Sequence, residues 1–221
     1  MSRLIDIGLE QLSKLLFKMG ELAENTVSLS LDSYTEGLEV HEKVRIWSET
    51  LVALSEEVEE KAIELIARYQ PVASDLRAIE SYIKIAYDLS RYGRYAWDIT
   101  FIYKRLNINP NDCMFPSLPI KELNEKVKNI VHISVEVVKK NDLDLAKKIS
   151  EMESEIDAAY YECLDKLVEQ DMDTIKCLVT NLLFIRHLER IADHASYIGE
   201  AITYLVTGKR VSLRGRMDKE S

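Results

Sequence analysis

The chain has 221 residues, of which 47% are hydrophobic and 30% are charged, a balance typical of a folded protein and too apolar for a disordered one. Its formal net charge of −9 argues against a general nucleic-acid-binding surface, because phosphate contacts need an excess of lysine and arginine. The chain holds only 7 glycines and 4 prolines, so we expect few turns and long helices.

The cysteines and the N-terminus suggest the compartment. Cys113, Cys163 and Cys177 are odd in number and form no Cys-x-x-Cys pair, which indicates neither a disulfide framework nor a zinc site with thiolate ligands. We therefore expect a reducing compartment. The first residues carry charges where a signal peptide needs an apolar core, and no stretch approaches the ~20 apolar residues of a membrane span. These features predict a cytoplasmic protein.

Apolar residues at steps of three and four predict six helices. The expected helices cover about residues 5–31, 39–69, 74–106, 119–140, 143–170 and 173–208. Three of the four prolines fall at Pro110, Pro116 and Pro119, which marks the clearest linker. We predict an all-α fold of two tandem three-helix bundles with short connections. The predicted parts are residues 1–106, a linker 107–118, residues 119–208 and a basic tail 209–221 that we expect to be disordered.

The two halves show an internal repeat. Aligning Leu89 with Leu188 places Arg91 on Arg190 and keeps the apolar residues of both helices in register. Such self-similarity is typical of duplicated helical units. We therefore expect the two bundles to be related to each other.

The last expected helix carries an acidic pair. Glu189 and Asp193 are four residues apart, so they lie one turn apart on the same side, near the edge of the apolar stripe. Carboxylates beside a packing seam are costly unless something compensates them. Arg186, three residues before Glu189, can pair with it. A structural salt-bridge network is therefore the main alternative to a metal site.

Two segments resemble the PhoU family of phosphate-uptake regulators. Gln70–Arg77 is similar to that family's turn between helices two and three, and Leu188–Ala195 is similar to its helix-three signature. The order of two three-helix repeats, over about residues 5–208, is similar too. The resemblance implies a non-catalytic cytoplasmic adaptor, a homodimer, that works with an ABC phosphate transporter and a membrane sensor kinase. Such an adaptor is expected to damp the phosphate-starvation response and thereby to regulate transcription. We expect the protein to bind no nucleic acid and to reach the membrane only through its partners.

The resemblance also implies metal binding through Glu/Asp-x-x-x-Asp motifs on the second and third helix of each repeat. In the second repeat, Glu153 and Asp157 match the motif on one helix, and Glu189 and Asp193 match it on the next. Four oxygen donors that converge favour a cation or a proton. We expect a divalent or trivalent ion such as iron, manganese, magnesium or zinc, and no other cofactor.

The first repeat departs from the motif, because none of its four corresponding positions carries a carboxylate ligand. These positions are Ser48, Val52, Ser90 and Arg94. We expect ion pairs in their place, between Asp88 and Arg91 and between Arg94 and Asp98. The metal site is therefore expected in the second repeat only.

Two other functions remain open. One is a helical scaffold or assembly protein without metal. The other is a carboxylate-bridged metalloenzyme, a class that needs Glu-x-x-His on two helices. None of the four histidines has a glutamate three residues before it, so we expect no catalytic residues.

Overall fold

The structure, a computed structural model, describes residues 3–113, 118–169 and 175–213. These residues form six α-helices and one short 3₁₀-helix, without strands, which confirms the all-α class. The elements are α1 (Leu4–Glu36), α2 (His41–Tyr69), α3 (Ser74–Leu106), η1 (Pro110–Cys113), α4 (Ile120–Lys140), α5 (Leu143–Val168) and α6 (Ile175–Thr207). Helix α1 continues five residues beyond the predicted end. The predicted residues 170 and 173–174 at the neighbouring ends of α5 and α6 lie outside the described residues.

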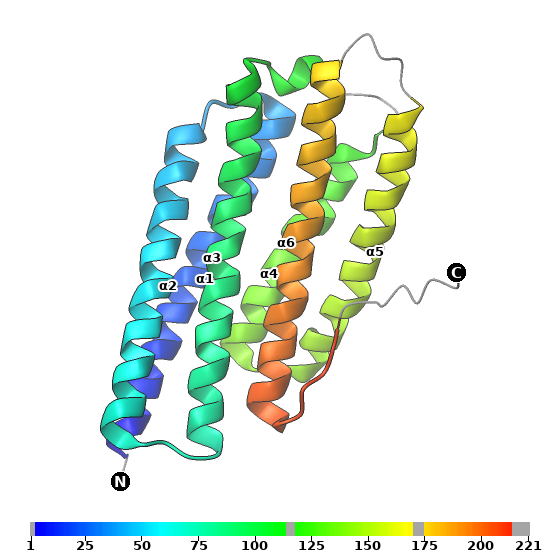
Figure 1. Ribbon diagram of the computed structural model, residues 1–221. Helices are drawn as coiled ribbons and strands as arrows, with labels where there is room; N and C mark the ends of the chain where they lie inside the picture. The colour runs from blue at the N-terminus through cyan, green and yellow to red at the C-terminus, as the bar shows by residue number, and fades with distance from the viewer. Residues whose placement is uncertain (1–2, 114–117, 170–174, 214–221) are drawn as a thin grey trace.

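The six helices are arranged as two three-helix bundles (Figure 1). Helices α1, α2 and α3 pack on one another, and so do α4, α5 and α6. The bundles meet through α3 against α6 and α1 against α4, and one hydrophobic cluster runs through both. Helices α3 and α6 lie side by side at the centre of the view, with α2 and α5 on the outside. The two repeats therefore share one core.

Several helices end on a residue in the left-handed conformation. Gly37 closes α1 with a φ of 70°, and its N–H donates to the carbonyl of Ser33 at 2.9 Å. Asn107 and Asn141 close α3 and α4 with φ values of 52° and 51°. Glycine and asparagine tolerate this conformation better than other residues. These residue types explain why the chain reverses at these places.

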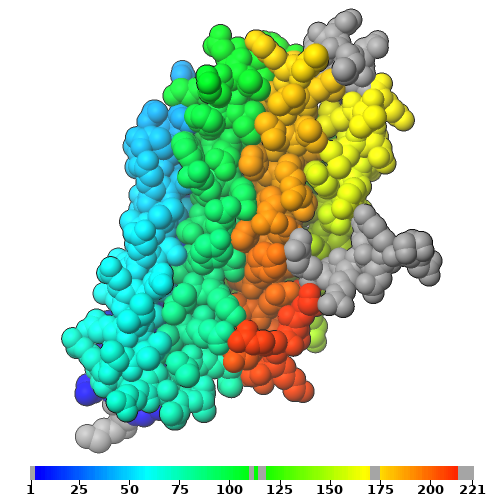
Figure 2. All heavy atoms as spheres, viewed as in Figure 1, coloured from blue at the N-terminus to red at the C-terminus, as the bar shows by residue number. Residues whose placement is uncertain are grey.

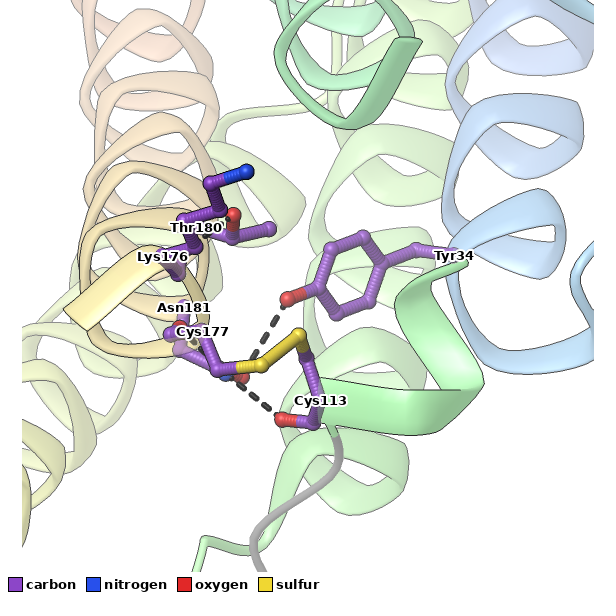
Figure 3. Close-up of a disulfide and its surroundings, with 6 residues drawn as sticks. All are labelled: Tyr34, Cys113, Lys176, Cys177, Thr180 and Asn181. Atoms are coloured by element: carbon purple, nitrogen blue, oxygen red, sulfur yellow. Dashed lines mark hydrogen bonds between the residues drawn. A yellow bond between two sulfur atoms is a disulfide. The ribbon is translucent and has the colours of Figure 1, made fainter. Parts of the chain in front are cut away.

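The structure contains a disulfide that the cysteine spacing does not indicate (Figure 3). Cys113 of η1 is bonded to Cys177 in the first turn of α6, across a sequence separation of 64 residues. Cys163 is the cysteine that stays free, and it is buried. The prediction that the three cysteines form no disulfide is wrong. Sequence spacing gives no sign of this pair, because only the packing of α4–α6 against the first repeat brings the linker to α6.

A hydrogen-bonded cluster surrounds the disulfide (Figure 3). The Asn181 side-chain amide donates to the carbonyl oxygens of Cys113 and Cys177 at 2.8 and 2.9 Å. The Tyr34 hydroxyl of α1 donates to Asn181 Oδ1 at 3.2 Å, and its ring stacks on Phe184 with centroids 3.6 Å apart. The disulfide, α1 and α6 are therefore joined at this end of the molecule.

The chain continues past α6 as a short segment against the second repeat. Gly208 makes the turn with a φ of 73°. The Leu213 N–H donates to Glu200 at 2.8 Å, and its carbonyl accepts from the Ser150 hydroxyl. Of the predicted disordered tail, residues 209–213 are thus placed, and residues 214–221 lie outside the described part. No helix within the described ranges is long and apolar enough to cross a membrane.

Candidate metal centre

The four predicted ligands lie on α5 and α6, two helices that pack against each other. Three of the four are buried, since Glu153, Glu189 and Asp193 expose only 6%, 8% and 2% of their surface. Asp157 is half-buried. Carboxylates occupy such positions only when other groups compensate their charge.

The acids interact electrostatically across the helix interface. Burial raises the pKa of Glu189, because desolvation disfavours its charged form. The neighbouring charges of Asp193 and, from α5, Asp157 raise this pKa further, whereas Arg186 and Arg190 lower it. The charge of one acid from α5 therefore acts on Glu189 of α6.

Two arginines of α6 hold the α6 acids. Arg186 Nη1 donates to Glu189 Oε2 at 2.6 Å, and Arg190 Nη1 donates to Asp193 Oδ2 at 2.6 Å. The Arg186–Glu189 pair is the one that the salt-bridge alternative predicts. Among the residues that the structure describes, no three His, Cys, Asp or Glu side chains are arranged to hold a metal ion. The oxygen donors suit a hard cation, but in this arrangement the arginines hold two of them.

A tyrosine of the first repeat supports this arrangement. The Tyr95 hydroxyl accepts from Arg91 at 2.8 Å and from Arg190 at 3.3 Å. The two guanidinium groups also lie over the Tyr95 ring, 4.7 and 5.9 Å from its centroid. One α3 residue thus positions an arginine of each repeat. This role of Tyr95 depends on the contact between α3 and α6, so the spacing of residues in the sequence does not predict it.

A contact between Asp88 of the first repeat and His194 of the second repeat also joins the two repeats. His194 Nδ1 lies 2.7 Å from Asp88 Oδ1, and both side chains are buried, with 5% and 7% exposed. The predicted Asp88–Arg91 pair is wrong, because Asp88 faces α6 and Arg91 turns to Tyr95. His194 therefore lies between α3 and α6. Burial raises the pKa of Asp88, although its hydrogen bond to His194 acts in the opposite direction.

Three of the four corresponding positions of the first repeat lie around one cavity, and Ser90 is not part of its lining. Ser48, Val52 and Arg94 line one cavity of about 280 Å³ between α2 and α3. Arg94 Nε lies 3.7 Å from Asp98 Oδ1, as predicted, and its guanidinium lies over the Trp97 ring. The repeat alignment therefore pairs the acidic positions of the second repeat with positions of the first repeat, where the cation Arg94 stands instead.

The fold defines a class of all-helical proteins built from two related three-helix units. A family model described as "PhoU domain" matches residues 16–101 and 120–202, which lie within α1–α3 and α4–α6. The chain belongs to the PhoU family.

Individual relatives agree with this assignment. The "Phosphate-specific transport system accessory protein PhoU homolog" of Clostridium acetobutylicum is 31% identical over 216 residues, covering 96% of this chain and 98% of that protein. The crystal structure of PhoU from Pseudomonas aeruginosa matches with a TM-score of 0.83 at 27% identity, covering 92% of this chain and 99% of that one. The phosphate transport system regulatory protein PhoU of Streptococcus pneumoniae shares the fold, with a TM-score of 0.84 at 24% identity over 94% and 99% of the two chains.

Proposed function

We propose that this protein is a non-catalytic regulator of phosphate uptake that acts in the cytoplasm. The observation that carries the proposal is the match over both repeats to a relative named as an accessory protein of a phosphate-specific transport system. In the finer form of the proposal, a homodimer acts as an adaptor between an ABC phosphate transporter and a membrane sensor kinase, and it damps the phosphate-starvation response.

Affinity purification of the tagged full-length chain tests the adaptor. We expect the transporter and the kinase to co-purify from phosphate-replete cells, and we expect deletion of the gene to switch on the starvation response in phosphate-rich medium. Light scattering of the purified protein should give twice the chain mass of 25.5 kDa. Recovery of neither partner in replete or starved cells, together with an unchanged response in the deletion strain, would overturn the adaptor.

We further propose that Glu153, Asp157, Glu189 and Asp193 bind one metal ion, such as iron, manganese, magnesium or zinc. Two features support this site: three of these acids are buried, and the charges of Asp193 and Asp157 raise the pKa of Glu189. A cation would stabilise all of their charged forms together. Binding requires the α6 arginines to release Glu189 and Asp193, so the arginines hold the acids when the metal is absent.

Elemental analysis of purified protein tests the metal site. After dialysis against each metal, we expect about one ion per wild-type chain and none in the double variant Glu189→Gln with Asp193→Asn. The matched control is Glu56→Gln with Glu60→Gln, an exposed acidic pair with the same spacing on α2, which should keep the ion. Equal metal content in the double variant and the wild type would show that these four residues are not the ligands.

A helical scaffold without metal is the second candidate. The observation that favours it is that Arg186 and Arg190 already neutralise Glu189 and Asp193 at 2.6 Å. Under this alternative, wild-type protein binds no metal in the same dialysis series. Replacing both arginines by glutamine would then lower stability without creating metal affinity, whereas the metal site predicts tighter metal binding in that variant.

A further inference from the structure

A large cavity has a lining that includes none of the four acids proposed to bind metal. It measures about 580 Å³ and lies between α2, α3, α6 and the C-terminal segment 208–213. Pockets for small molecules usually measure roughly 300–1,000 Å³. Figure 2, viewed as in Figure 1, shows the red end of the described chain at the lower end of α6. From this segment the Arg210 side chain reaches Glu80 of α3. Both repeats contribute walls, so an occupant would touch both.

Tyrosines form a large part of the cavity wall. Tyr87 comes from α3, and Tyr197 and Tyr204 come from α6. The rings of Tyr87 and Tyr197 also contact His194, at centroid distances of 6.3 and 5.3 Å, which anchors them to the α3–α6 contact. The face of a tyrosine ring attracts cations, because its π-electrons are negative there.

The charges of the cavity favour a cation as well. The buried Asp88, whose side chain is only 7% exposed, lines the cavity together with Glu59 and Glu200. Burial disfavours the charged form of the Asp88 carboxylate. An incoming cation would stabilise this form in addition to the hydrogen bond from His194.

The two cations of the lining do not balance these acids. Lys84 Nζ and Arg210 Nη2 both contact Glu80 Oε1, at 2.9 and 2.7 Å, and Glu80 is not part of the lining. Glu80, outside the cavity, therefore contacts both cations, and Lys84 also lowers the pKa of Asp88 by its charge. The three carboxylates of the lining still outnumber its two cations.

The chain itself shows that this wall binds a cation. The Arg210 guanidinium lies over the Tyr204 ring, 4.3 Å from its centroid. Arg210 thus combines an aromatic face with a carboxylate, the same two elements that Tyr87, Tyr197 and Asp88 offer in the cavity lining.

We propose that this cavity is a binding site for a small organic cation, an ammonium group carried on an apolar body. The ammonium group faces Asp88, and the apolar body packs against Tyr87, Tyr197 and Tyr204. This site is separate from the proposed metal site and does not depend on it.

Three probes with the same ring and different charge test the proposal by calorimetric titration of the full-length protein. These probes are 2-phenylethylamine, the neutral 2-phenylethanol and the anionic phenylacetate. We expect saturable binding of the amine, at least about tenfold tighter than that of the alcohol, since a buried charge pair is at stake. Phenylacetate should not bind. Equal binding of the alcohol, tighter binding of phenylacetate or no binding of any probe would overturn the proposal.

Variants locate the binding. Asp88→Asn should weaken amine binding about tenfold or more by removing the charge, and Tyr87→Leu should weaken it severalfold by removing a ring face that is 56% exposed. Asp98→Asn is the matched control, because it changes an acid of the same helix outside the cavity, and it should bind the amine normally. Tyr87→Leu also keeps the test decisive if Asp88→Asn fails to fold. Unchanged affinity in Tyr87→Leu, or equal losses in Asp98→Asn, would refute the site.

Discussion

At the scale of single residues, polar groups inside this bundle are held by partners from other helices. The Tyr92 hydroxyl of α3 lies 2.9 Å from the Ser134 hydroxyl of α4, and the Ser30 hydroxyl of α1 donates to the Ala96 carbonyl of α3 at 2.8 Å. A satisfied buried hydrogen bond contributes about 1 kcal/mol, and an unsatisfied group costs more. These bonds therefore fix the rotation of each helix about its axis as well as its place.

His187 is a half-buried residue without such a partner at its buried Nδ1 atom. Its Nδ1 has no hydrogen-bond partner among the described residues. Burial, assisted by the charge of Arg186, lowers the pKa of His187 from 6.5 to about 4. The folded protein therefore keeps His187 neutral at pH values where the unfolded chain binds a proton.

We predict that His187 makes the protein less stable in mild acid. At neutral pH His187 is neutral in both the folded and the unfolded protein and has no effect on stability. As the pH falls from about 6.5 to about 4, the unfolded chain binds a proton that the folded protein does not bind. The free energy of unfolding therefore drops by up to about 3 kcal/mol. In His187→Phe this loss should disappear, so urea unfolding of variant and wild type at pH 7 and pH 4.5 measures it. The same change at the exposed His132 serves as control. Parallel pH profiles for wild type and His187→Phe would contradict the prediction.

The residue pairs show which parts of the candidate site can be read from sequence. Arg186 and Glu189 lie on one helix, where a spacing of three residues is enough to predict their contact. Asp88 and His194 are 106 residues apart and meet only because α3 packs on α6. Neither of these two residues carries a local pattern that points to the other. The same holds for Tyr95 and Arg190.

At the scale of elements, helix periodicity and stop signals make the six helices predictable. Helix α3 has the bounds expected from sequence, because Pro71 precedes it and Asn107 ends it. The predicted end of α1 at residue 31 is too early, because the polar residues before Gly37 still belong to the helix. The disulfide was missed, because periodicity describes each helix alone and says nothing about which helix ends meet.

We predict that the Cys113–Cys177 bond stabilises the fold. In the chain-entropy model, a closed loop of this length contributes about 4 kcal/mol, which corresponds to a melting temperature higher by roughly 10 °C. Circular dichroism melts with and without a phosphine reductant should show this difference in wild type and in Cys163→Ser, but not in Cys113→Ser with Cys177→Ser. Equal melting temperatures of reduced and oxidised wild type would contradict it. Cytoplasmic thiols are usually kept reduced. If the protein acts in the cytoplasm, as proposed above, we therefore expect the Cys113–Cys177 bond to form when conditions become oxidising.

At the scale of the whole molecule, the two repeats are coupled rather than independent. Helices α3 and α6 form an extensive interface, and one hydrophobic cluster spans both bundles. At Gly20 of α1, an added Cβ would lie 2.9 Å from the Val135 side chain of α4, which shows how closely the repeats approach. The repeated pattern can be seen in the sequence. How closely the two repeats approach each other depends on the packing of side chains between them, which an alignment of the two halves does not describe.

We predict that neither repeat folds well alone. Separate fragments 3–109 and 118–213 would expose the α3–α6 and α1–α4 surfaces, so each should show reduced helicity and a broad melt. Mixing the fragments should restore helicity, and the intact chain should melt in one cooperative transition. The measurement is circular dichroism of each fragment, of the mixture and of the intact chain. A sharp melt of either fragment by itself would show that the shared core is dispensable.

The bond between η1 and α6 has a consequence for the covalent topology of the chain. It closes a ring that contains α4, α5 and the turn at Asn141 and Asp142. A protease that cuts once inside this ring opens it without releasing any piece. The nicked protein would run as one species on a non-reducing gel and separate into two fragments only after reduction. A cut at the α2–α3 turn near Pro71, outside the ring, would leave two pieces held by packing alone.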